Sequence, residues 1–352
     1  MHKVILIGCE GFGRLWWDIL QKNAIVTAVV DINENALHKA KTAFNLDERQ
    51  CYKPSDAWEK SEATIMIDCS PFQHHYSNIM RALSHNMHVL SSKPLCATAK
   101  EALSLLEMTR KFSHLSCFVI QQKRYYPVFK ELKKMVEQEV LGRIESIKIE
   151  LYLSGLGWMP GHEWRSRMSQ PTLYEAAIHH FDIIQSVLQD PFTDVMGYSW
   201  NPSWSPFSGD ASVYVLLKSK RGTLVKYDAT FAQRDKSKTI LFDSGWEIEG
   251  TTGVAKVENG QIYLNGEMYT ALEASPDLPA LNEIVWQQFM DSIGSPFTHE
   301  LSFSGNMNAL IPLFACEESV NTGSWINIKQ YVRSLTHGNQ LSDSIAGSPS
   351  FG

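Results

Sequence analysis

Two groups suited to proton transfer lie one helical turn apart in the stretch 174–182, which reads YEAAIHHFD. In a helix, Glu175, His179 and Asp182 occupy positions i, i+4 and i+7 and share one face. Histidine titrates near neutral pH, so an imidazole can take a hydroxyl proton while a hydride leaves the same carbon. The spacing favours acid–base chemistry at an alcohol. A salt-bridged polar stripe on a partly buried helix is the alternative.

A lysine marks a second reactive position. Lys93 follows the strand predicted at 88–91, with Ser92 between them, and so lies at the carboxyl end of that strand. Open α/β sheets bind their ligands at that edge. An ammonium group there can hydrogen-bond a substrate hydroxyl or stabilise an alkoxide, and a surface lysine in a turn is the alternative.

A glycine-rich loop, GCEGFG at residues 8–13, follows the first predicted strand and precedes a helix. Gly8 and Gly13 stand at the first and third positions of the dinucleotide-binding pattern GxGxxG, and Glu10 replaces the second glycine. Asp31 ends the next strand, where it would accept hydrogen bonds from the adenosine ribose. The context predicts an NAD site, because an aspartate at that strand end repels the 2′-phosphate of NADP.

Two side chains complicate this nucleotide site. Glu10 would cost roughly 3 kcal/mol if its carboxylate lay about 5 Å from a phosphate at an effective dielectric near 20. That is on the order of a hundredfold in affinity, which weakens binding without abolishing it. Arg14, just beyond the third glycine, could meet phosphate charge and slightly weakens the preference for NAD over NADP.

The loop at 154–170 brings aromatic and arginine side chains to the start of the predicted catalytic helix. We expect substrate contacts from Trp158, Trp164 and Arg165, since aromatic rings suit polyol faces and guanidinium groups suit phosphates or carboxylates. Packing of this loop against the first domain is the alternative for each residue.

The elements around these positions divide the chain in two. In the first part, strands at 3–8, 25–31, 63–69, 88–91 and 115–121 alternate with helices at 12–22, 34–43, 75–85 and 98–111. This order predicts βαβ units and a parallel sheet covered on both faces. We therefore expect a dinucleotide-binding (Rossmann) domain at 1–123.

The second part, 124–336, has a different pattern. Strands are predicted at 144–153, 194–200, 211–218, 222–231, 239–249, 253–258 and 261–264, with helices at 128–139, 172–188, 281–293 and 304–322. The alternation favours an α+β domain with an open, mostly antiparallel sheet. The tail at 337–352 has few large apolar residues and is predicted to be disordered.

Composition limits the possible partners. The net charge of -6 argues against a nucleic-acid-binding protein, and no apolar run reaches about 18 residues, so we expect no membrane span. The six cysteines form no CxxC pair, which favours a reduced, cytoplasmic setting. Glu175 and His179 could bind a metal with His162 or His180, but spacing fixes no third ligand, so we expect none.

Several further motifs occur in a characteristic order. They are Pro71 and His75 in Pro-x-x-x-His, Lys93 and Pro94 after a strand, Arg124 and Pro127, Trp164-Arg165, and Glu175, His179 and Asp182. In the second of these motifs Ser92 stands in place of a glutamate. In the last, Glu175 stands in place of an aspartate. With the glycine loop and the segment at 318–323, this order resembles the glucose–fructose oxidoreductase / inositol dehydrogenase (Gfo/Idh/MocA) family from Val4 to about Gly323.

The resemblance implies NAD(P)-linked oxidoreduction at a secondary alcohol of a sugar, cyclitol or related polyol, and a homodimer or homotetramer formed through the second sheet. It implies that Lys93 and His179 handle the proton and that Glu175 orients the substrate. Expected cofactor contacts are Gly8, Glu10, Gly11, Phe12, Gly13, Arg14, Asp31, Ser70, Pro71, His75, Ser92, Lys93 and Gln121. Expected substrate contacts are Lys93, Arg124, Trp158, Trp164, Arg165, Glu175 and His179.

Other functions stay open on the sequence. Glu10, Ser92 and the stretch Ser169-Gln170-Pro171 depart from the family pattern at functional loops. They would suit a sensor or partner protein that binds a nucleotide or sugar without turnover. They would also suit the same fold with altered chemistry, such as imine reduction or NAD-assisted glycoside cleavage.

Overall fold

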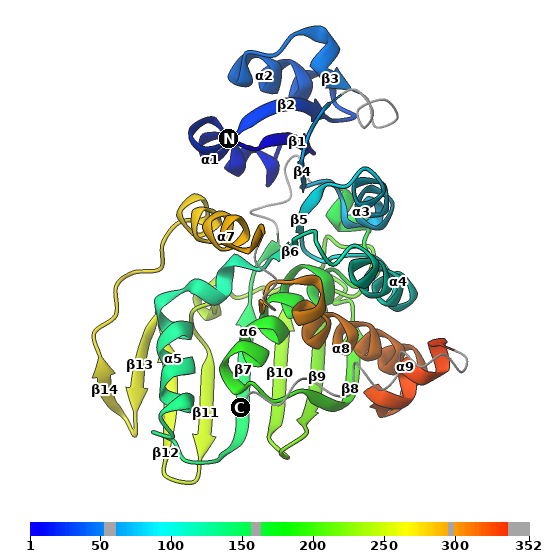
Figure 1. The fold of residues 1–352 in the computed structure, drawn as a ribbon. Coiled ribbons are helices and arrows are strands. Elements are labelled where there is room, and N and C mark those ends of the chain that lie inside the picture. The colour runs from blue at the N-terminus through cyan, green and yellow to red at the C-terminus, as the bar shows by residue number, and fades with distance from the viewer. Residues whose placement is uncertain (53–60, 156–162, 295–298, 337–352) are drawn as a thin grey trace. The chain divides into compact units, whose positions relative to one another are not determined.

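The computed structural model of the chain describes residues 1–52, 61–155, 163–294 and 299–336 (Figure 1). Its contacts define two compact units, Met1–Gln122 with Pro276–Met307, and Lys123–Ser275 with Asn308–Gly352. The first unit is therefore discontinuous in sequence, whereas the sequence analysis assigned all of 124–336 to the second domain. The tail predicted at 337–352 lies outside the described residues.

The first unit is built on a parallel sheet. Its strands are β1 (Lys3–Ile7), β2 (Ile25–Val30), β3 (Cys51–Tyr52), β4 (Ile65–Asp68), β5 (His88–Ser92) and β6 (Cys117–Ile120). They lie in the order β3-β2-β1-β4-β5-β6, so the strand order reverses between β1 and β4. This is the doubly wound dinucleotide-binding topology, and the predicted Rossmann domain is confirmed.

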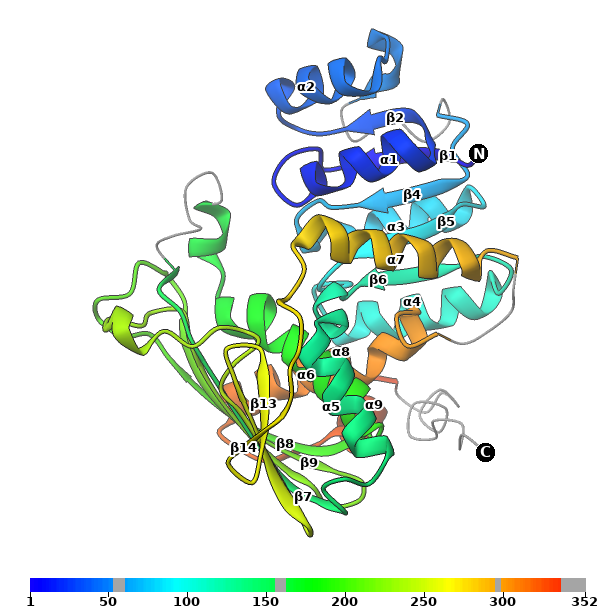
Figure 2. The same ribbon diagram turned by 90° about the vertical axis from the view of Figure 1, so that its left-hand side faces the viewer.

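Helices cover both faces of this sheet. Those of the first unit are α1 (Trp17–Asn23), α2 (Glu34–Phe44), α3 (His75–Ser84), α4 (Ala99–Lys111) and α7 (Leu278–Ser292). Helices α1 and α7 lie on one face, and α3 and α4 lie on the other (Figures 1 and 2). Strands β4 and β6 are buried along their whole length, which explains their continuous apolar runs.

Side-chain caps fix where these helices begin. The Asn33 side chain accepts hydrogen bonds from Asn35 and Ala36 at the start of α2. Thr98 and Glu101 form a capping box at the start of α4. Such caps satisfy backbone N–H groups that the first helical turn leaves unpaired, so the loops before the helices have defined end points.

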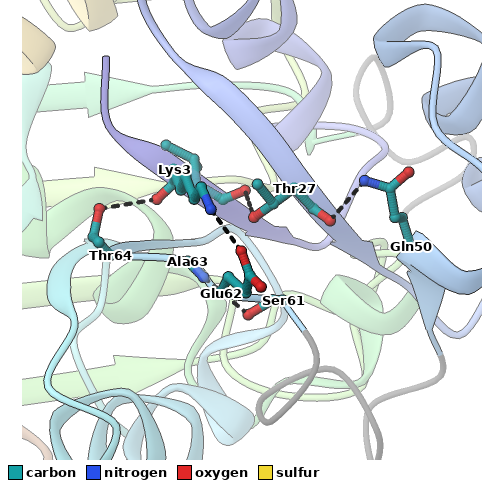
Figure 3. A network of polar contacts seen from close by, with 8 residues as sticks. Lys3, Thr27, Gln50, Ser61, Glu62, Ala63 and Thr64 are labelled. Atoms are coloured by element: carbon teal, nitrogen blue, oxygen red, sulfur yellow. Dashed lines mark hydrogen bonds and ion pairs between the residues drawn. The ribbon is translucent and has the colours of Figure 1, made fainter.

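The amino ends of the strands are held together by polar contacts (Figure 3). The Lys3 ammonium group lies 2.6 Å from a Glu62 carboxylate oxygen, and the Thr64 hydroxyl donates to the Lys3 carbonyl at 3.2 Å. Gln50 donates from its side-chain amide to the Thr27 carbonyl at 3.3 Å. This edge lies opposite the glycine loop and has a structural role.

The second unit contains a nine-stranded sheet in the order β14-β13-β12-β11-β7-β10-β9-β8-β15. Its strands are β7 (Ile144–Tyr152), β8 (Phe192–Trp200), β9 (Ser212–Ser219), β10 (Leu224–Thr230), β11 (Trp246–Gly250), β12 (Gly253–Glu258), β13 (Gln261–Leu264), β14 (Glu267–Thr270) and β15 (Ile326–Asn327). Among the described strands, β7 and β10 form a parallel pair, and the other pairs of this sheet are antiparallel. The predicted mostly antiparallel sheet is confirmed.

One face of this second sheet is covered by helices. They are α5 (Pro127–Glu137), α6 (Ile178–Leu188), α8 (Phe303–Thr322) and α9 (Ile328–Thr336), and Figure 1 shows α5, α6 and α8 in front of the strands. Strand β9 alternates buried and exposed residues, as expected for a sheet with one solvated face. None of the helices in the described ranges has the length and apolar character needed to cross a membrane.

Some local expectations differ from the structure. The strand predicted at 239–249 begins only at Trp246, because the preceding residues form turns. The helix predicted at 172–188 starts with a π-helical turn at Leu173–Ala177 before α6. A π turn has i→i+5 hydrogen bonds and occurs frequently at functional sites.

Candidate functional site

The glycine loop allows the backbone to approach closely at the strand switch point. Gly8 has a φ of 77°, and a Cβ atom there would lie 2.7 Å from the Cys69 carbonyl carbon. A Cβ atom on Gly13 would lie 1.8 Å from the Gly8 carbonyl oxygen. The first and third glycines are thus required by the backbone of β1, β4 and the short helix η1 (Gly13–Trp16).

The side chains of the loop are also engaged. Glu10 forms an ion pair with Lys39 of α2, with 2.8 Å between carboxylate oxygen and ammonium nitrogen. Asp31 accepts hydrogen bonds from the backbone N–H of Cys9 at 2.7 Å and of Asn33 at 2.9 Å. The Arg14 guanidinium lies 4.1 Å from the centre of the Trp17 ring. Glu10 therefore has a cationic partner, which the sequence analysis did not anticipate.

These residues fit a dinucleotide. Without side chains, Gly8 and Gly13 let the backbone at the carboxyl end of β1 pass close to neighbouring backbone, and Gly11 has a φ of 57° that favours glycine. Asp31 follows β2 at the position where a carboxylate meets the ribose. Gly8, Glu10, Gly11, Phe12, Gly13, Arg14 and Asp31 thus lie together at one edge of the sheet.

A second loop, after β4, is held by a buried polar network. Ser70 donates its hydroxyl to Asp68 at 2.6 Å, and the Asn78 side-chain amide donates to the other Asp68 oxygen at 2.9 Å. The fully buried His75 ring lies 2.8 Å from the Ser70 carbonyl through Nε2 and 2.7 Å from the Pro94 carbonyl through Nδ1. His75 therefore connects the loop after β4 to the turn after β5.

That turn contains the predicted lysine. The Ser92 hydroxyl, at the end of β5, lies 3.2 Å from His75 Nε2, and Lys93 follows it directly. His75 thus contacts both neighbours of Lys93, the hydroxyl of Ser92 and the carbonyl of Pro94. Pro71 precedes the short helix that leads to His75, and Gln121 is buried immediately after β6. All of the expected cofactor residues of the first unit lie at the carboxyl ends of its strands.

In the second unit, a buried ion pair anchors α6. Arg124 donates from Nε to one Asp182 oxygen at 2.9 Å and from its terminal nitrogen to the other at 2.6 Å. Both side chains are almost completely buried. This bidentate geometry is the strong form of an arginine–carboxylate contact. The guanidinium that we expected to bind substrate is engaged with the helix that carries His179.

Glu175 and His179 lie on the π turn and the first turn of α6. The Glu175 carboxylate accepts from Arg165 Nε at 3.2 Å, and Arg165 itself stacks on Trp164 at 4.7 Å. The His179 ring is buried and meets the Phe242 ring edge-on, with centroids 5.8 Å apart. Three of the expected substrate residues, Trp164, Arg165 and Glu175, are therefore linked in one chain of contacts.

A neighbouring cluster was missed by the sequence analysis. His180 stacks on Phe242 with centroids 4.7 Å apart, and its Nδ1 lies 3.1 Å from the Tyr227 hydroxyl. The Lys123 ammonium lies 3.1 Å from the centre of the Phe242 ring. Burial, with the nearby charge of Lys123, lowers the pKa of His180 to about 3, so this ring is neutral at ordinary pH.

The predicted site residues are divided between the two units, and two of them cannot be placed. Trp158 and His162 lie outside the described residues. Lys93 belongs to the first unit, and Glu175 and His179 belong to the second. Within the part of the chain that the structure describes, no three His, Cys, Asp or Glu side chains are grouped to hold a metal ion.

Each of the two units contains a segment that matches a known protein family. Residues 2–120 match an oxidoreductase family with an NAD-binding Rossmann fold, and residues 129–256 match the GFO/IDH/MocA C-terminal domain. The chain belongs to the Gfo/Idh/MocA family. The resemblance inferred from the motifs is confirmed, as are the NAD-binding domain and the assignment to the oxidoreductases.

Individual relatives are distant. An uncharacterized protein, y4oX, of Sinorhizobium fredii is 25% identical over 96% of this chain and 98% of its own length. An inositol 2-dehydrogenase/D-chiro-inositol 3-dehydrogenase of Lactiplantibacillus plantarum is 24% identical over 56% of each chain. An oxidoreductase of Agrobacterium radiobacter, solved with NAD+, L-tartaric acid and magnesium, superposes with a TM-score of 0.81 at 17% identity. That superposition covers 94% of this chain and 99% of the other.

Proposed function

We propose that this member of the Gfo/Idh/MocA family is an NAD-dependent dehydrogenase that interconverts a secondary alcohol and a ketone. Its substrate is a sugar, a cyclitol or a related polyol. The observation that carries the proposal is His179, a buried imidazole on the first turn of α6, four residues after the Glu175 carboxylate that pairs with Arg165. The relative in L. plantarum, an inositol dehydrogenase, supports the substrate class.

Residues of the chain itself accept the proton and orient the substrate. The nicotinamide group, when bound, supplies the hydride acceptor. His179 takes the proton of the substrate hydroxyl, and its buried position beside Phe242 limits competition from water. Arg165 fixes the Glu175 carboxylate, which then accepts a hydrogen bond from a neighbouring hydroxyl and sets the orientation of the substrate.

Lys93 supplies the second polar contact to the reacting oxygen. Its ammonium group donates a hydrogen bond to the alcohol and stabilises negative charge as the proton leaves. The backbone around it is held by the contacts of His75 with Ser92 and Pro94. Lys93 belongs to the first unit and His179 to the second, so single variants test the two residues separately.

Variants at these two residues test the proposal. Lys93→Met and His179→Asn should each lower kcat by about 10²–10⁴-fold with NADH binding retained. Lys100→Met and His114→Asn are matched controls on the first unit's surface. The assay follows NAD reduction with a panel of sugars, cyclitols and aminocyclitols, and nucleotide fluorescence follows binding. Full activity in both variants would refute the assignment, and turnover of no alcohol by a protein that binds NADH would favour a non-catalytic binding protein.

We also propose that the chain associates into a homodimer or homotetramer through the open face of the second sheet. Tyr198, Tyr214 and Leu216 are 64%, 48% and 45% exposed on neighbouring strands, and Trp200 packs 4.7 Å from Tyr214. An exposed aromatic patch of this kind favours association. Light scattering should show a dimer or tetramer that Leu216→Lys dissociates, and a monomeric wild type would exclude the proposal.

A cytoplasmic setting accords with the cysteines. All six lie in the described ranges and are free thiols. Reduced cysteines are usual in the cytosol. We propose this location together with the enzyme activity, and fractionation of the source cells would test it.

A further inference from the structure

The position of Glu10 is unusual because a nucleotide-binding loop ordinarily has glycine there. Its carboxylate is directed to Lys39 on α2, the helix that follows Asp31 in sequence. Both side chains of the pair are exposed to solvent, Glu10 at 41% and Lys39 at 64%. An ion pair this accessible contributes little to stability, so a structural role does not account for it.

Two further contacts connect the Glu10–Lys39 pair to Asp31. Cys9, the residue before Glu10, donates its N–H to the Asp31 carboxylate at 2.7 Å. The other Asp31 oxygen accepts from Asn33, the cap of α2. Glu10, Asp31 and Lys39 are therefore joined through the glycine loop and the start of α2, which is the region that meets the adenosine ribose in this fold.

We infer that the Glu10–Lys39 ion pair selects NAD over NADP. A protein that accepts NADP needs a cation near the ribose to meet the 2′-phosphate. Lys39 is the cation that the structure places against the glycine loop, and Glu10, 2.8 Å away, neutralises it. Asp31 then remains as the uncompensated charge at the ribose and repels the 2′-phosphate. Glu10 thus acts on specificity through Lys39, in addition to any effect on the pyrophosphate that both cofactors share.

The charges predict whether each substitution raises or lowers the affinity for NADPH relative to NADH. Glu10→Gln leaves Lys39 without its partner and adds one positive charge, which favours NADPH. Lys39→Met leaves Glu10 as an additional negative charge and disfavours NADPH further. The double variant removes both charges and restores the wild-type balance. A unit charge about 8 Å from a doubly charged phosphate in water-like surroundings changes affinity by roughly fivefold.

The experiment measures dissociation constants for NADH and NADPH by nucleotide fluorescence, at low and at moderate salt. We expect the ratio of NADPH to NADH affinity to rise about fivefold in Glu10→Gln, to fall in Lys39→Met, and to return to the wild-type value in the double variant. These changes should shrink at high salt. Lys41→Met, on the same helix and paired with Glu48, is the matched control and should leave the ratio unchanged.

The inference rests on the nucleotide site of the proposed function, and the outcomes separate the two. An unchanged ratio in both single variants overturns the inference and leaves the dehydrogenase proposal in place. Equal strengthening of NADH and NADPH in Glu10→Gln also overturns it, because Glu10 would then act only on the shared pyrophosphate. Failure of the wild-type protein to bind either nucleotide at millimolar concentration overturns both.

Discussion

The buried ion pair between Arg124 and Asp182 permits a quantitative prediction. Its atoms meet at 2.9 and 2.6 Å, and the two side chains are 6% and 2% exposed. Asp182→Ala leaves a guanidinium group buried without its carboxylate, so we expect a loss of about 3–5 kcal/mol in the free energy of unfolding. With a urea m value of about 2–3 kcal/mol/M, the midpoint should fall by about 1–2.5 M.

A double-mutant cycle separates the pair from its surroundings. The cycle consists of Arg124→Met, Asp182→Ala and the variant with both changes, which removes the uncompensated charge and should be more stable than Asp182→Ala. Urea unfolding followed by tryptophan fluorescence measures all variants, with Lys134→Met on the exposed face of α5 as the control. Additive single effects, or a loss below about 1 kcal/mol in Asp182→Ala, would contradict the anchoring role.

Three other perturbations test separate parts of the structure. Gly13→Ala places a methyl group 1.8 Å from the Gly8 carbonyl, so NADH titration should show binding weakened by about a hundredfold or more. Because the pKa of His180 falls from 6.5 to about 3 on folding, the unfolded state binds its proton first, and stability should fall as pH falls from about 6.5 toward 3. Urea unfolding at pH 5 and pH 7 should show a smaller difference in His180→Phe. Burial raises the pKa of Cys117 to about 12, so iodoacetamide should label the half-buried Cys51 first in native protein, as mass spectrometry would show.

The sheet of the first unit could be predicted well because its signals are local. Apolar runs without alternation marked β4 and β6, and the caps of α2 and α4 are short-range sequence features. The turns at 239–245 were harder to predict from the sequence. Their residues have the β-propensity of a strand, but among the described residues only Ile240 has a strand partner. Tertiary context overrides propensity at such positions.

Pairings between distant residues could not be predicted. Glu10 and Lys39 were both visible as charges, but 29 residues separate them, and only the fold brings them together. Arg124 and Asp182 are 58 residues apart, and their spacing gave no indication that each satisfies the other. The sequence therefore indicated which residue types lie at the carboxyl ends of the strands. The structure was needed to tell which charged side chains anchor an element and which are exposed.

The π turn at Leu173–Ala177 also determines how this segment responds to changes in chain length. A π turn holds one residue more than the α-helical turn it replaces, so deleting a residue there would restore a regular helix. The buried Ala176 and Ala177 are small enough to be removed without a large cavity. The deletion would leave the acid at 175 and His179 at positions i and i+3, which still share one helix face. Deleting a residue from the regular part of α6 would instead rotate the residues before it by about 100°, so the π turn is the place where this segment can lose one residue at least cost to the site.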